Sequence, residues 1–146
     1  MHERDYHILT NNPLAAGILG SRYSTEFHPE MTLREILVLA RDRVYMGHAL
    51  YTHPLAGSVK PNETPYKSVV IARKPGSFDA EQGLLMENAL ATCYKFPKRE
   101  RILDEKVLED LQLIDYTLLS GGIGFDAAAG LSGTGNRTKQ EGGAAS

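Results

Sequence analysis

The sequence predicts a small α/β domain, of two or three layers, around a mostly parallel four-stranded sheet. Short apolar or β-branched runs alternate with longer stretches of helical periodicity, which is the pattern of strands connected by helices. Hydrophobic residues make up 42% and charged residues 23% of the 146 residues, as in a globular protein. The formal net charge of -2 argues against a dedicated duplex-nucleic-acid-binding protein, because such a protein needs an excess of basic residues.

Four segments are predicted to form strands. They are rich in apolar and β-branched residues and end near Pro, Gly or Asn, which is typical of short strands. They cover residues 6–10, 24–28, 48–52 and 67–74. If the second strand lies on the far side of the first, the carboxyl ends of the first and third flank a topological switch point. Open α/β sheets usually bind ligands at such a point.

Two helices are predicted in the first third of the chain. Asn12 is expected to cap a short helix over residues 14–19, with Pro13 at its first position. Residues 32–35, Thr-Leu-Arg-Glu, form a capping box that begins a second helix with one apolar face. Gly47 is a natural end for that helix.

Two longer helices are predicted in the second half. The first runs from Asp79 to about Phe96 and carries Cys93 on its apolar face, where a buried, inert thiol is expected. The second is expected to be capped by Asp104 and to end at Gly121. Its inward residues are predicted to be Val107, Leu108, Leu111 and Leu118.

The chain is predicted to contain one folded domain over residues 1–120 and a Gly-rich flexible tail over residues 121–146. No apolar run is long enough to span a membrane, and the N-terminus does not resemble a secretion signal. The cytoplasm is therefore the expected compartment. The single cysteine excludes an internal disulfide and a zinc site made of cysteines.

Residues 52–67 form the segment most informative about function. The segment is long for a loop and contains Pro54, Pro61 and Pro65, which restrict its shape. Between Gly47 and Lys74 there are four Lys or Arg residues and one acid, so this part of the chain is cationic. A cationic hollow beside backbone amides is suited to an anion.

We therefore expect a site for a small anionic molecule, such as a phosphate ester, an acyl phosphate or a carboxylate, where this loop meets the end of the first strand. The expected ligand-binding residues are Thr10, Asn11, Asn12, His53, Gly57, Ser58, Lys60, Asn62 and Lys67. The alternative is that the loop is a rigid connector with solvated lysines. No phosphate-loop or dinucleotide motif, metal-ligand cluster or cofactor motif is recognised.

His53 has two interpretations. Imidazole exchanges protons readily near neutral pH, so His53 could act as a general acid or base, or bind the anion. On a loop after a strand it could equally bond a backbone group. No nucleophile motif accompanies it.

Several stretches resemble the GrdX protein family. They are Leu-Thr-Asn-Asn-Pro-Leu at residues 9–14, Gly-His at 47–48, Thr-His-Pro-Leu at 52–55, residues 57–68, Glu-Lys-Val-Leu-Glu-Asp at 105–110 and Leu-Ile-Asp at 113–115. The resemblance covers about residues 6–119 and excludes the tail. It implies an accessory protein of the glycine, sarcosine and betaine reductase systems of amino-acid-fermenting anaerobes, and it transfers no catalytic residue. The chain has no selenocysteine or redox cysteine pair, which argues against a catalytic reductase subunit.

Three hypotheses follow for the function. The first is an accessory protein that binds a small anionic ligand at residues 52–67. The second is an assembly factor whose loop, with Tyr66, docks on a reductase subunit. The third is a small enzyme with His53 as general base and Lys60 or Lys67 stabilising negative charge. The oligomeric state is left open.

Overall fold

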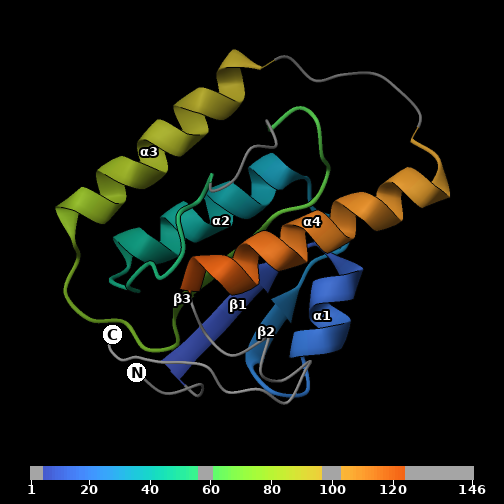
Figure 1. Cartoon of the computed structure of the whole chain (residues 1–146). Helices are drawn as coiled ribbons and strands as arrows, with labels where there is room; N and C mark the ends of the chain where they lie inside the picture. The colour runs from blue at the N-terminus through green and yellow to red at the C-terminus, as the bar shows by residue number, and fades with distance from the viewer. Residues whose placement is uncertain (1–4, 56–60, 97–102, 124–146) are drawn as a thin grey trace.

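Strands and helices alternate through most of the chain (Figure 1). The computed structural model describes residues 5–55, 61–96 and 103–123. Its elements are β1 (Tyr6–Thr10), α1 (Pro13–Leu19), β2 (Ser24–Phe27), α2 (Leu33–Tyr45), β3 (Ser68–Ala72), α3 (Ala80–Lys95) and α4 (Glu105–Ile123). The predicted α/β class is confirmed. None of these helices combines the length and apolar character needed to cross a bilayer.

The sheet has three strands in the order β2-β1-β3. The central strand β1 pairs with β2 in parallel, with Ile8 opposite Thr25, and with β3 antiparallel, with Ile8 opposite Val70. The prediction of a four-stranded, mostly parallel sheet is therefore wrong in strand number and in direction. The second strand lies on the far side of the first, which is the condition under which a ligand site was expected at this edge.

Residues 48–52, predicted as a strand, make only one isolated bridge, from Leu50 to Ile71 of β3. The backbone N–H of Tyr51 also donates to the carbonyl of Val70, at 2.9 Å. On the outer side, the side chain of Gln82 in α3 accepts from the N–H of Leu50 at 2.9 Å and donates to its carbonyl at 3.3 Å. A side chain thus occupies the edge where a further strand would pair.

The direction of β3 follows from the connection before it. Parallel neighbours need a crossover, usually a helix. No helix lies in the described part of the chain between Tyr45 and Ser68. The chain therefore returns antiparallel beside residues 49–51, and β3 lies between them and β1.

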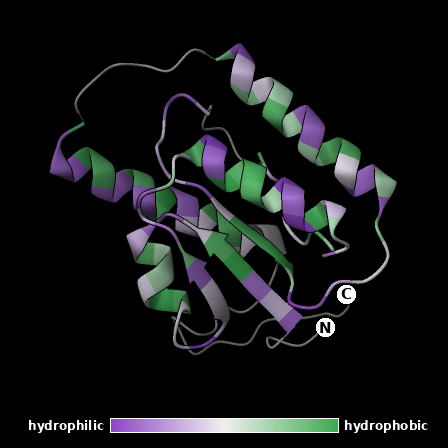
Figure 2. Ribbon diagram, turned by 180° about the vertical axis from the view of Figure 1, so that it is seen from behind, coloured by the Kyte–Doolittle hydropathy of each residue, from purple (hydrophilic) through white to green (hydrophobic). Residues whose placement is uncertain are grey.

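The helices cover both faces of the sheet, so the fold has three layers (Figures 1 and 2). Side chains alternate along β1: Leu9 faces α2 and α3, while Ile8 faces α1 and α4. In β3, Val69 and Ile71 join the first core, and Val70 joins the second. β3 is apolar along most of its length in Figure 2, as expected for a strand buried on both faces.

Local signals at the helix starts behave as predicted. The side chain of Asn12 accepts from the N–H of Leu14 at the start of α1. Thr32 and Glu35 form the complete capping box of α2. Asp79 accepts from two N–H groups in the first turn of α3. Each cap satisfies backbone donors that the helix itself leaves unpaired.

The predictions for α4 need correction. The helix continues past Gly121 to Ile123, and residues 124–146 of the predicted tail lie outside the described residues. Its buried side chains are Asp115, Tyr116 and Leu119. Val107, predicted to face inward, is exposed, and Leu108, Leu111 and Leu118 are half-buried. The helix therefore presents a partly polar face to the sheet.

Candidate functional site

A buried polar network lies where β1 ends and β3 begins. Thr10 pairs with Ser68 in the sheet, and their hydroxyls are 2.7 Å apart. The Ser68 hydroxyl donates to Asp115 of α4 at 2.6 Å, so the Thr10 hydroxyl donates to Ser68. The backbone N–H of Asn12 donates to Thr10, and its amide group donates to Asp115, both at 2.9 Å. The network ties α4 to this edge of the sheet.

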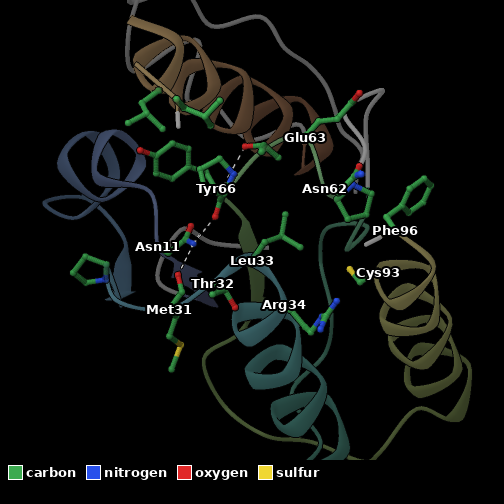
Figure 3. A pocket seen from close by; sticks show the side chains of 16 residues that line it. Asn11, Met31, Thr32, Leu33, Arg34, Asn62, Glu63, Tyr66, Cys93 and Phe96 are labelled. Atoms are coloured by element: carbon green, nitrogen blue, oxygen red, sulfur yellow. Dashed lines mark hydrogen bonds between the residues drawn. The ribbon is translucent and has the colours of Figure 1, made fainter. Parts of the chain in front are cut away.

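Next to this network, Asn11 forms hydrogen bonds with the end of the long loop over residues 52–67 (Figure 3). Its amide group donates to the carbonyls of Met31 and Pro65, each at 2.8 Å. Its side-chain oxygen accepts from the N–H of Lys67 at 2.8 Å. Asn11 therefore holds the end of the loop against the segment that leads into α2.

A cavity of about 610 Å³ lies next to Asn11 (Figure 3). Besides Asn11, four parts of the chain form its walls: residues 29 and 31–34, residues 61–66, the end of α3 at Cys93 and Phe96, and Leu103 and Leu108 around the start of α4. Its volume is within the range of cavities that hold organic ligands. Segments far apart in sequence thus enclose one concave site.

Among the described lining residues, Arg34 carries the positive charge. It extends from α2 toward α3 beside Cys93 (Figure 3), and its guanidinium lies 4.3 Å from the ring centre of Tyr94. Within the described part of the chain, the guanidinium makes no hydrogen bond or ion pair. Stacking on an aromatic ring holds a guanidinium in place while its N–H donors stay available.

Cys93 is buried, as predicted, and lines the same cavity. Burial raises the pKa of its thiol, and the positive charges of Arg34 and Lys67 offset this only in part. A thiol in such surroundings stays protonated and reacts slowly.

The structure does not bring all the expected ligand-binding residues together. Asn11 and Asn62 both line the cavity. Thr10 and Asn12 are buried in the polar network. His53 is exposed, and its Nδ1 accepts a hydrogen bond from the N–H of Leu55 at 3.0 Å. A bond to a backbone group was the alternative to a chemical role for this side chain. Gly57, Ser58 and Lys60 lie outside the described residues.

Lys67 does not line the main cavity. Its side chain borders a second, much smaller cavity of about 20 Å³ together with Asp115. Burial lowers the pKa of Lys67, and the nearby Asp115 and Cys93 partly offset this. Arg73 and Lys74 directly follow β3 at its other end, so they do not join Lys67 in a single cationic hollow.

A second cluster surrounds Glu26 on β2. His7 of β1 contacts Glu26 at 3.0 Å, His28 at 2.7 Å and Arg43 of α2 at 3.0 Å. Burial alone would raise the pKa of Glu26, but these three hydrogen bonds outweigh it and lower the pKa to about 2. Among the described residues, no group of three or more His, Cys, Asp or Glu side chains is arranged to hold a metal ion.

Sequence reasoning gave Arg34 no role in a site because it stands inside the capping box, where an exposed side chain is ordinary. The Glu26 cluster was also missed, since its members are spread over β1, β2 and α2. No local signal in the sequence identifies either feature.

A model of the GrdX-like protein family matches residues 7–124. This chain belongs to the GrdX-like protein family. The match includes the sheet, the helices and the long loop of this GrdX-like chain, so the family resemblance seen in the sequence is confirmed. Comparison with curated proteins and with solved structures gives no match.

Proposed function

We propose that this GrdX-like chain is an accessory protein of the glycine, sarcosine and betaine reductase system that binds a small anionic ligand in the cavity beside Asn11. The observation that carries the proposal is the placement of Arg34. It stands on the wall of a cavity of about 610 Å³, and its guanidinium donors have no hydrogen-bond partner in the part of the chain that the structure describes. Arginine binds carboxylate and phosphate groups through two parallel hydrogen bonds.

The rest of the site supports this use. Asn11 fixes the loop that forms one wall, so the cavity does not have to be built when a ligand arrives. Glu63, the other charged residue on the wall, is already engaged in an interaction of its own. Among the described residues, the ligand therefore meets one available positive charge in a largely preformed site.

Isothermal titration tests the proposal with inorganic phosphate, acetyl phosphate and glycine as probes. We expect at least one of the two phosphates to bind the wild-type chain. Arg34→Ala should weaken that binding about tenfold or more, because hydrogen bonds to charged groups contribute about 1.5–3 kcal/mol. Arg41→Ala is the matched control, since Arg41 is on the same helix but pairs with Asp42 and does not line the cavity.

Two outcomes would overturn the proposal. One is that no anion binds, neither these probes nor a longer carboxylate. The other is that Arg34→Ala and Arg41→Ala bind equally well, which would assign the binding to another part of the surface. Circular dichroism of both variants confirms that they are folded.

A second candidate is docking on a reductase subunit. Two apolar side chains of α4, Leu113 and Ile114, are exposed, and Ile114 borders the small cavity beside Tyr66. Exposed apolar residues of this kind can anchor a partner. In a pull-down with purified reductase subunits, docking predicts binding that survives Arg34→Ala but is lost in Leu113→Asp. The reverse pattern argues for the ligand site instead.

The enzyme hypothesis for His53 gains no support from its placement. The ring is exposed, one nitrogen is engaged by a backbone N–H, and the residue does not line the main cavity. The groups suited to bind an anion lie elsewhere.

A further inference from the structure

The main cavity is far larger than a bare anion requires. Its volume of about 610 Å³ is comparable to pockets that enclose organic molecules of many heavy atoms. Phosphate or a two-carbon acid bound to Arg34 would leave most of this space to water. The size of the cavity therefore carries information about the ligand beyond its charge.

Most polar groups on the wall are already used. The side-chain amide of Asn11 is bonded to Met31, Pro65 and Lys67. The hydroxyl of Thr32 accepts from the N–H of Glu35 in the capping box. Asn11 is therefore not left to bind a polar ligand, whereas the Thr32 hydroxyl keeps its proton and the buried Oδ1 of Asn62 has no hydrogen-bond partner among the described residues.

The rest of the wall is mainly apolar. Met31 and Leu33 contribute from the start of α2, Phe96 from the end of α3, and Leu103 and Leu108 from the region of α4. Pro29, Pro61 and Pro65 add further carbon surface. Such a surface gains from contact with hydrocarbon and gains nothing from a second charge.

We propose that the ligand is an amphipathic acid, with an anionic head bound by Arg34 and an apolar body that fills the space between α2, α3 and α4. This inference rests on the proposed function and names the chemical class of its ligand. The head supplies orientation through the guanidinium, and the body supplies affinity through burial of carbon. Short hydrophilic acids lack the second contribution.

A series of unbranched carboxylates tests the inference: acetate, butyrate, hexanoate and octanoate, with 1-hexanol as the uncharged match for hexanoate. In isothermal titration we expect affinity to rise about threefold to fourfold per methylene until the cavity is filled. Hexanoate should bind about tenfold or more tightly than 1-hexanol. Arg34→Ala should remove the advantage of hexanoate over 1-hexanol while keeping the dependence on chain length.

A second pair of variants examines the apolar wall. Leu108→Asn places an amide on the wall and should reduce hexanoate binding severalfold. Leu84→Asn is the matched control, because Leu84 is exposed on α3 and does not line the cavity. Equal effects of the two substitutions would contradict the proposed position of the apolar body.

The outcomes separate this inference from the proposed function. If phosphate or acetyl phosphate binds through Arg34 but hexanoate binds no more tightly than acetate, the amphipathic ligand is wrong and the anion site stands. If no anion binds, both are wrong. If hexanoate and 1-hexanol bind equally in the wild type and in Arg34→Ala, the uptake is unspecific and the inference is overturned.

Discussion

Glu26 offers a direct test of the electrostatics that join β2 to its neighbours. Its carboxylate contacts His7 on β1, His28 after β2 and Arg43 on α2. The fall of its pKa from 4.5 to about 2 corresponds to about 3 kcal/mol in favour of the folded state. Because 26% of the side chain is exposed to solvent, screening reduces the expected contribution to about 2 kcal/mol.

The pH dependence follows from the direction of this shift. A lowered pKa in the folded state gives a contribution that is complete above about pH 4.5 and is lost as the pH falls toward 2. Glu26→Gln should therefore lower the free energy of unfolding by about 2 kcal/mol at pH 7. The gap between variant and wild type should shrink to less than about 0.5 kcal/mol at pH 2.

Urea denaturation at pH 7, 5, 3 and 2 measures this gap. Glu30→Gln is the control, since Glu30 is 70% exposed and lies 3.6 Å from His28. The control should track the wild type at every pH. A Glu26→Gln variant that matches the wild type at pH 7 would refute the reasoning. A gap that persists unchanged at pH 2 would mean that packing, and not charge, is responsible.

Further predictions concern the polar network, the thiol and two glycines. Asp115→Ala should cost about 2–4 kcal/mol in urea denaturation, because buried donors lose their acceptor, while Asp110→Ala, on the exposed face of α4, should leave stability nearly unchanged. Cys93 should react with a thiol reagent much more slowly in the folded chain than in urea; equal rates would show that the thiol is accessible. Gly47→Ala should lower stability by more than about 1 kcal/mol, because φ is 103° and the added carbon would lie 2.0 Å from a carbonyl oxygen. Gly17→Ala, on α1 with nothing within 4 Å, should raise stability by up to about 1 kcal/mol, and thermal unfolding compares the two.

The features that could be predicted from sequence are the local ones. Asn12, Thr32 and Asp79 each bond a backbone group two or three residues away, so the signal and its partner lie in the same short stretch. β1 and α2 were predicted well for the same reason. Their apolar periodicity is visible without knowing what they pack against.

The inward face of α4 could not be predicted in this way. Periodicity favours apolar residues, yet Asp115 is buried and Val107 is exposed. The burial of Asp115 depends on donors from Asn12 and Ser68, which are 103 and 47 residues away. Only the tertiary fold shows that these partners exist, so a buried acid in this helix looks like a surface residue in the sequence.

Sequence reasoning expected residues 10–12 and the long loop to meet at one edge of the sheet, and Asn11 does contact the end of that loop, but for a different reason. The expectation was that the carboxyl ends of two parallel strands would bring residues 10–12 to the long loop. In the structure, β3 is antiparallel to β1, so its first residue, Ser68, pairs with the last residue of β1, Thr10. The loop that precedes β3 must therefore end beside Asn11, and it does so through Lys67. The antiparallel direction of β3 thus places the end of the loop at this edge. Because α2 starts at the same edge, Arg34 and the loop line the same cavity.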